Sequence, residues 1–264
     1  MNRRRFTFAA LSLALLSATA CGFLGNNYPP YRYRLTVEVD TPEGVKTGSS
    51  VLEVRIMQGY RNMVGAGGAT SKARGEAVAV DLGPRGTMFA LLTSAVDQDW
   101  AGQAMESVTT PVADQEVEGV SAGDAGTKAR LDIIFARIMA TKGAQLLPRK
   151  NPEPGYGQLI PDGRADNYPQ MVRFRDIRDP KSVEAVDTDD LAKSFGPGVT
   201  LKRITVQITD DPVTVGIRKR LAWLENVGKT RATLIPDPPR ILANVKEPGI
   251  QLLGPSAFST ELYQ

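Results

Sequence analysis

Residues 33–56 read YRLTVEVDTPEGVKTGSSVLEVRI, and this stretch decides the fold class. Apolar side chains recur at every second position at its start and again near its end, a period that predicts two strands, each buried on one face. Residues 41–44, Thr-Pro-Glu-Gly, have the composition of a turn, because proline presets φ at the first central position. The stretch therefore predicts an antiparallel hairpin.

A second hairpin is predicted further along the chain. Apolar residues alternate over 78–82, residues 83–86 carry the glycines of a turn, and residues 87–93 form another apolar run. Two successive hairpins predict an antiparallel sheet with one face covered. The glycine-rich residues 59–75 are expected to form a loop, and residues 94–126, which lack a sustained period, are expected to be mostly loop.

The remaining elements are helices and strands of the C-terminal half. Apolar residues spaced three and four apart over 127–142 predict a helix with one buried stripe that covers the sheet. We expect strands at 171–177 and 201–209, a short helix at 188–195, and a helix from Asp211-Pro212 to residue 227. The sequence thus predicts an α+β fold, with antiparallel β-hairpins forming a sheet covered by two or three helices.

The N-terminus has the pattern of a secretory signal. Three arginines at positions 3–5 precede an apolar run over residues 6–20 that ends in small residues. A run of about 15 residues is shorter than the roughly 20 that a membrane-spanning helix needs. Residues 2–6 also resemble a degenerate twin-arginine export signal, which leaves the export route open. Removing residues 1–20 leaves 29 basic side chains against 29 acidic ones, so the mature chain is formally neutral.

The only cysteine of the chain follows this run directly, in the sequence Leu-Ser-Ala-Thr-Ala-Cys-Gly at positions 16–22. This segment resembles the lipobox of bacterial lipoprotein precursors. The resemblance implies that Cys21 receives a diacylglyceryl group and becomes the first residue of the mature protein. The segment departs from the usual pattern at Ala18, where leucine is commonest, and Ala18 with Ala20 also fits ordinary signal peptidase, which leaves a soluble product open.

A lipid anchor also agrees with membrane chemistry and with the sorting pattern of these precursors. Two or three acyl chains hold a protein durably to a bilayer, at about 0.8 kcal/mol per buried methylene, whereas one chain does not. Gly22 stands where an aspartate would imply retention at the inner membrane. The resemblance therefore implies the outer membrane, with the protein facing the periplasm.

These boundaries divide the chain into five parts. We expect a signal peptide at 1–20, a lipidated tether at 21–31, an N-terminal β-rich part with one helix at 32–147, a Pro- and Gly-rich connection at 148–170, and a C-terminal α/β part at 171–264. The two larger parts could form one domain or two.

The composition excludes several kinds of function. The chain has no histidine, so it cannot contain a Ser-His-Asp or Cys-His mechanism or a histidine-rich metal site. We expect no cofactor and no metal. Beyond residue 5 the densest basic cluster is 218–220, which is typical of a solvated helix face, so we expect no nucleic-acid partner.

Three motif-like segments have simpler explanations. Residues 119–123 match the G-x-S-x-G pattern, but that motif requires a histidine base. Residues 65–72 resemble a phosphate loop but lack glycine directly before Lys72. Asp187, Asp189 and Asp190 lack the glycine of a calcium loop, and we expect this cluster to cap a helix.

Paired carboxylates are the catalytic device that the composition leaves available, since glycoside cleavage needs only an acid and a base or nucleophile. Asp97, Asp99 and Trp100, with Glu106 beyond, are the first candidates. A carboxyl group beside an aromatic ring can have its pKa raised, and sugars stack on indole. The alternative is a polar loop with one anchoring tryptophan.

Tyrosines alternate with arginines where the tether meets the first strand. Tyr28, Tyr31 and Tyr33, with Arg32 and Arg34 between them, could contact a glycan or a protein partner close to the membrane. Alternatively, the segment is a tether end whose rings and arginine stems lie over the sheet.

The body of the chain resembles uncharacterised hypothetical envelope proteins of Gram-negative bacteria over residues 33–51 and 208–224. No catalytic residue follows from that resemblance. We expect a non-enzymatic, lipid-anchored cell-envelope protein that binds another envelope component or has a structural role. The alternative is a carboxylate-dependent hydrolase acting on cell-wall glycan.

Overall fold

The computed structural model describes residues 28–58, 69–95, 97–112, 114–117, 124–149, 167–230, 233–235 and 248–263. The predicted signal peptide, Cys21, residues 119–123 and most of the predicted connection lie outside these ranges. None of the helices in these ranges combines the length and the apolar character needed to cross a membrane.

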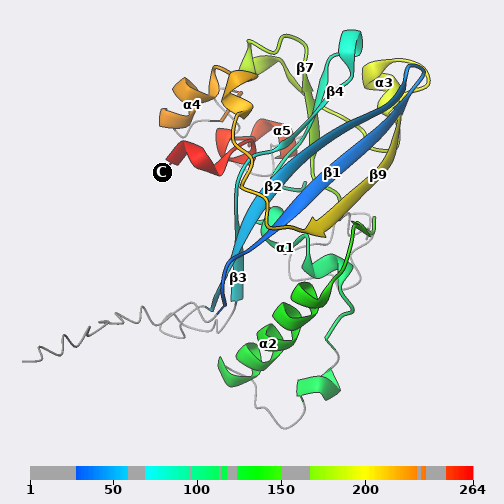
Figure 1. Cartoon of the computed structure of the whole chain (residues 1–264). Coiled ribbons are helices and arrows are strands. Elements are labelled where there is room, and N and C mark those ends of the chain that lie inside the picture. Colours follow the sequence, from blue (N-terminus) through cyan, green and yellow to red (C-terminus); the bar gives the residue numbers. More distant parts are fainter. Residues whose placement is uncertain are drawn as a thin grey trace, which may run out of the picture.

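The first sheet has five antiparallel strands in the order β3-β2-β1-β9-β6 (Figure 1). Its strands are β1 (Tyr31–Thr41), β2 (Gly44–Gln58), β3 (Ala69–Arg74), β6 (Gln145–Leu146) and β9 (Thr200–Ile208). The hairpin predicted from residues 33–56 is confirmed, with Tyr33 opposite Leu52 in the register of β1 and β2. The strand predicted at 201–209 is β9, which pairs with β1.

The second sheet has four antiparallel strands in the order β4-β5-β7-β8. Its strands are β4 (Val78–Asp81), β5 (Thr87–Ala90), β7 (Met171–Phe174) and β8 (Val183–Ala185). The second predicted hairpin is confirmed as β4 and β5, and it lies in a different sheet from the first. Both sheets combine strands from before and after residues 148–170.

The helices are short apart from one. They are α1 (Trp100–Gln103), α2 (Asp124–Ala140), α3 (Leu191–Phe195), α4 (Leu224–Thr230) and α5 (Pro248–Gln251). Single 3-10 turns lie at Gly83–Arg85, Glu106–Val108, Asp114–Val117, Pro180–Ser182, Ile217–Lys219, Pro255–Ala257 and Thr260–Tyr263. The antiparallel α+β class predicted from the sequence is confirmed.

A first core lies between the two sheets. Odd-numbered residues of β1 from Tyr31 to Val39 are buried there, while the even-numbered ones stay partly exposed. Val78, Val80 and Met88 face them from β4 and β5. The sheets approach each other closely at Gly48, where a Cβ would lie 2.4 Å from the carbonyl oxygen of Ala79. The strict alternation of β1 therefore arises because every second side chain packs against the other sheet.

A second core lies on the other face of the four-stranded sheet, beneath α4, α5 and the C-terminal 3-10 turns (Figure 1). β5 is buried on both faces, since Met88 and Ala90 belong to the first core and Phe89 and Leu91 to the second. Four aromatic rings gather in this second core, from Phe89, Phe174, Trp223 and Phe258. The four-stranded sheet is thus the middle of three layers.

The helix predicted at 127–142 is confirmed as α2, and it packs at one end of the first sheet. The ring of Phe135 lies 5.2 Å from that of Tyr28 and 6.3 Å from that of Tyr31, measured between centroids. Leu131 and Ile138 complete the buried stripe. α2 therefore covers the first residues of β1, below the sheets in Figure 1.

The helix predicted from Asp211 is wrong in its first half. Residues 209–216 form an extended crossover, followed by a 3-10 turn at 217–219 and then α4. The Asp211 carboxylate accepts from Thr209 and Arg34 instead of capping a helix. Thr214 bonds in both directions with the backbone of Val51, at 2.8 and 3.0 Å. These long-range contacts hold the backbone extended against its local preference for a helix.

The loop predicted at 59–75 is also partly wrong, because its last residues form β3. Residues 69–74 pair with residues 53–58 of β2 and become the edge strand of the first sheet. Lys72, the residue that resembled the lysine of a phosphate loop, lies in the middle of this strand. β3 is where the structure brings charged side chains together.

Candidate functional site

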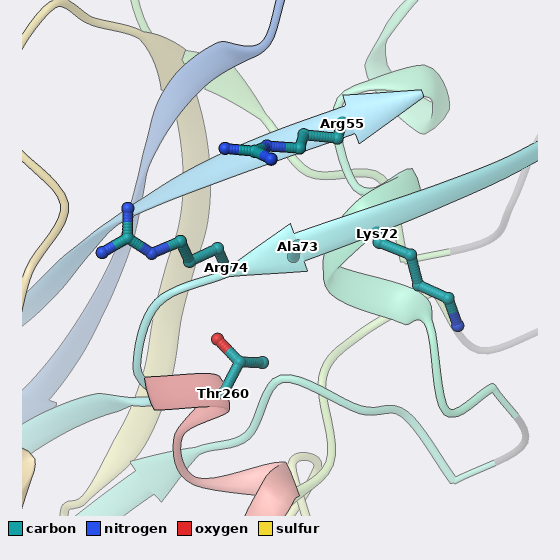
Figure 2. Close-up of a pocket in the computed structure, with 5 residues that line it drawn as sticks. All are labelled: Arg55, Lys72, Ala73, Arg74 and Thr260. Carbon is teal, nitrogen blue, oxygen red and sulfur yellow. The ribbon is translucent and has the colours of Figure 1, made fainter. Parts of the chain in front are cut away.

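An open pocket of about 420 Å³ lies along β3 (Figure 2). It is lined by Arg55 of β2, by Lys72, Ala73 and Arg74 of β3, and by Thr260 of the C-terminal segment. In Figure 2 the side chains of Arg55 and Arg74 extend in the same direction, whereas that of Lys72 points away from them. Three of the five lining residues are cations, so the pocket is basic.

The register of β2 and β3 places these cations on the outer face of the sheet. Arg55 pairs with Lys72 and Glu53 pairs with Arg74, while the intervening residues Val54 and Ile56 point into the first core. Successive side chains of a strand point to opposite faces, so burial of the apolar set forces the charged set outward. The alternation of the sequence therefore creates the basic surface.

Each cation of the pocket has a carboxylate partner. Arg74 donates from Nε and Nη2 to the two carboxylate oxygens of Glu261, at 2.8 and 3.1 Å. Lys72 lies 2.6 Å from both carboxylate oxygens of Asp99.

The third ion pair of the pocket is looser. Arg55 makes one 3.3 Å contact with Glu53, its neighbour two positions earlier in the same strand. Among the three cations, Arg55 is therefore the least constrained by its partner.

Gly102 brings α1 against the edge of β3. A Cβ on this residue would lie 2.0 Å from the carbonyl oxygen of Ser71, so only glycine permits this approach. The contact carries Asp99, which directly precedes α1, to the Lys72 ammonium. Residues that are 27 positions apart in sequence thus form an ion pair beside the pocket.

The carboxylates predicted as catalytic candidates have separate partners. Asp97 accepts the backbone N–H of Asp99 at 2.8 Å, and burial raises its pKa. Asp99 pairs with Lys72. The Trp100 indole is buried and donates to the carbonyl of Asn167 at 2.8 Å, so it anchors the segment and offers no face for sugar stacking. None of the residues that line the β3 pocket is acidic.

Glu106 lies on the inner side of β3. Its carboxylate accepts the Ser71 hydroxyl at 3.0 Å, and burial of the carboxyl group raises its pKa. The Tyr31 hydroxyl is also buried, and it has no hydrogen-bond partner within the described ranges. Burial, followed by the charge of Glu106, raises the pKa of Tyr31 well above its usual range. Neither Tyr31 nor Glu106 is among the residues that line the pocket.

Replacing Glu106 with glutamine should raise stability at neutral pH by about 0.5–2 kcal/mol, the usual range for stabilising substitutions. A raised pKa means that the folded protein binds this proton more tightly than the unfolded chain does. The contribution of Glu106 is therefore complete below the unfolded pKa and is lost as the pH rises through the folded pKa. Glutamine stays neutral and still accepts from Ser71. Urea unfolding between pH 4 and 8 measures the difference.

The control for this prediction is Glu225→Gln, which removes the same charge at an exposed position of α4. It should leave the pH dependence of the wild-type protein unchanged. If Glu106→Gln instead lowers stability at pH 7 and keeps the wild-type slope, then the ionised carboxylate is the stabilising form and the inferred cost of its burial is wrong.

The tyrosine and arginine segment is engaged inside the protein. Tyr33 donates its hydroxyl to the carbonyl of Ala101 at 2.6 Å, and Tyr31 lies in the same core. Arg32 donates to the backbone carbonyl of Asp211 at 2.8 Å, and Arg34 pairs with the Asp211 side chain. The rings lie in the core and the arginines bind the crossover, so the contacts of this segment stabilise the fold.

The aspartate cluster at 187–190 has structural roles. Asp190 accepts the backbone N–H of Lys193 at 3.2 Å and caps α3, as predicted. Asp189 pairs with Arg149 at 3.0 Å. Across the ranges that the structure describes, no group of three or more histidine, cysteine, aspartate or glutamate residues is placed to hold a metal ion.

Neither protein-family models, nor curated proteins, nor solved structures match this chain. What the pocket can bind therefore follows from its own residues. The sequence had indicated Lys72 and Asp99 separately, for other reasons, and had not indicated Arg55, Arg74 or Thr260. The alternation Lys-Ala-Arg at 72–74 is the signal present in the sequence, and it covers too few residues to predict a strand.

Proposed function

We propose that this chain is a lipid-anchored protein of the bacterial cell envelope, acylated at Cys21, whose folded body is a binding module. The observation that carries the proposal is the lipobox-like segment at residues 16–22, which ends in the only cysteine of the chain. Tyr28, the first residue that the structure describes, stands seven positions after Cys21 in the sequence.

Tyr28 is held to α2, which limits how far Cys21 can lie from the body. The Tyr28 hydroxyl donates to the Asp132 carboxylate at 2.7 Å, and its ring packs on Phe135. Asp132 also pairs with Lys128 at 2.6 Å. A lipid at Cys21 would therefore keep α2 and the neighbouring end of the first sheet close to the membrane. Gly22 favours the outer membrane, with the body in the periplasm.

Two observations support a binding role: the contacts of the candidate catalytic carboxylates, and the residues that line the pocket along β3. Glycoside hydrolysis needs an acid and a second carboxylate on either side of one bond. Asp97, Asp99 and Glu106 instead contact a backbone amide, a lysine and a serine hydroxyl respectively. The pocket along β3 presents cations to solvent, which suits recognition of a charged ligand better than proton transfer.

Cys21→Ser should abolish incorporation of radiolabelled palmitate and release the protein from the membrane fraction. Thioether linkage requires the sulfur, and the loss of two or three acyl chains removes the anchor. Ala18→Leu, which restores the commonest residue of the lipobox, is the matched control and should keep full labelling. If the wild-type chain takes up no label, and globomycin causes no precursor to accumulate, the anchor proposal is overturned.

A further inference from the structure

We propose that the pocket along β3 binds a phosphate group through the guanidinium groups of Arg55 and Arg74, with Lys72 adding positive charge at its edge. The preference of the site for phosphate follows from the exposure and the hydrogen-bond donors of these side chains. Only its placement beside a membrane surface rests on the proposed function.

The ion pairs of the pocket are layered, with the cations on the solvent side. The Arg55 side chain is 60% exposed and that of its partner Glu53 is 16% exposed. For Arg74 and Glu261 the values are 41% and 11%, and for Lys72 and Asp99 they are 50% and 37%. In each pair the carboxylate is the more buried member. A ligand approaching from solvent therefore meets three positive groups first, although the pairs sum to no net charge.

The arginines also have donors that their partners do not use. A guanidinium carries five N–H donors. Among the residues that the structure describes, Arg55 makes one contact of 3.3 Å, and Arg74 donates from Nε and Nη2 but not from Nη1. Both come from neighbouring strands and extend in the same direction (Figure 2). The guanidinium groups of Arg55 and Arg74 can therefore donate to different oxygens of the same ligand.

The number and charge of the donors favour phosphate over carboxylate. One arginine satisfies both oxygens of a carboxylate, as Arg74 does with Glu261. A phosphate monoester has three terminal oxygens and close to two negative charges at neutral pH, so it can accept from the guanidinium groups of both Arg55 and Arg74 at once. The volume of about 420 Å³ accommodates such a group with part of its carrier.

The pocket lies at the end of the first sheet where the chain enters. Tyr31 pairs with Val54 at the start of β1, and Arg55 is the next residue beyond this pair. The span from Cys21 to Tyr28 reaches at most about 25 Å when fully extended. If Cys21 is acylated, the pocket is held near the lipid headgroups. A lipid with a phosphomonoester headgroup, such as phosphatidic acid, and a soluble phosphate monoester share the required chemistry.

Lysine and arginine on an edge strand also have a simpler role, because charges there prevent pairing with the edges of other sheets. That role requires no ligand and makes no distinction among anions. The two explanations therefore differ in a binding experiment. A protective edge alone predicts no saturable phosphate binding.

The test uses the mature chain carrying Cys21→Ser, titrated with inorganic phosphate and with glycerol 1-phosphate at constant ionic strength. NMR signals of the arginine Nε–H groups report contact at Arg55 and Arg74. We expect saturable shifts of these two signals and no such shifts with acetate. Arg55→Gln should weaken the affinity about tenfold or more, since one charge-assisted contact is lost.

Arg178→Gln is the matched control. Arg178, like Arg55, pairs with an acid two positions earlier, and it is strongly exposed in the loop after β7. It should change the phosphate affinity less than twofold. Absence of saturable shifts, equal shifts with acetate, or equal losses in the two variants would overturn the proposal.

A second arm separates the two sources of phosphate. Vesicles of phosphatidylcholine with 30% phosphatidic acid, whose headgroup is a phosphate monoester, are compared with phosphatidylcholine alone in a flotation assay. Binding to the anionic vesicles that is lost in Arg55→Gln assigns the site to a headgroup. Binding of glycerol 1-phosphate without vesicle binding assigns it to a soluble compound. Palmitate labelling does not involve the pocket. A negative result in the phosphate experiments would therefore overturn the binding proposal without affecting the lipid-anchor proposal.

Discussion

Replacing Phe258 with alanine should lower the free energy of unfolding by about 3–5 kcal/mol, the usual cost of removing a fully buried phenylalanine. Its side chain is completely buried in the second core. Its ring lies 5.8 Å from both Phe174 and Trp223 and 6.1 Å from Phe89. Loss of the ring would remove three aromatic contacts and leave a cavity at the centre of the C-terminal layer. Urea unfolding followed by tryptophan fluorescence measures the loss, because Trp223 is in contact with the site.

Leu252→Ala is the control for Phe258→Ala. Leu252 lies in the same C-terminal segment but is largely exposed, so its truncation should cost about 0.5 kcal/mol or less. If the two variants lose similar stability, the C-terminal segment contributes little to the fold, and the second core is not a structural unit. A large loss for Phe258→Ala alone would establish that this segment is required to cover the four-stranded sheet.

Little of this second core could be predicted from the sequence. Phe258 lies between two 3-10 turns, in a segment interrupted by prolines, where no period of two or 3.6 can develop. Its position depends on long-range contacts, such as the 2.9 Å bond from the Ala77 amide to its carbonyl and the bridge between Glu76 and Ser259. These contacts join residues far apart in the sequence and leave no local periodicity from which they could be predicted.

The two hairpins were predictable for the opposite reason. Each β1 residue that faces the first core is followed by one that faces solvent, so burial appears directly in the sequence. The same logic failed at Asp211-Pro212, which has the local chemistry of a helix start. There Arg34 and the backbone of Val51 compete successfully for the groups that a helix would use. Tertiary contacts overrode a local preference.

The candidate site was predictable only in fragments. The sequence indicated Asp99 as a catalytic candidate and Lys72 as part of a segment that resembles a phosphate loop. Their ion pair could not be predicted, because it requires α1 to pack on β3 through Gly102. Arg55 and Arg74 alternate with core residues, and in a sequence such charges look like any solvated face. On the outer face of a sheet, polar residues alternate with buried apolar ones whether or not they bind a ligand. Their spacing in the sequence therefore does not distinguish a binding site from an ordinary exposed face. It becomes visible only when the register of the strands is known.

Gly48→Ala should destabilise the protein by about 3 kcal/mol, at the upper end of the range for overpacked cores. The added Cβ would lie 2.4 Å from the carbonyl oxygen of Ala79 and 2.9 Å from its carbonyl carbon. These are backbone atoms of β4 in the opposite sheet, so no side-chain rotation relieves the clash. Gly48 is not among the glycines with positive φ, which means that the cost comes from the contact and not from backbone strain.

Ser49→Ala provides the comparison, because Ser49 is the next residue of β2 and points to the exposed face. Its change in unfolding free energy should stay within about 0.5 kcal/mol, as for most surface positions. Urea unfolding of both variants gives the difference directly. A loss in Gly48→Ala no larger than that in Ser49→Ala would mean that the sheets can separate at this point without cost. The expected loss means instead that the two sheets are held at a fixed spacing by one residue without a side chain.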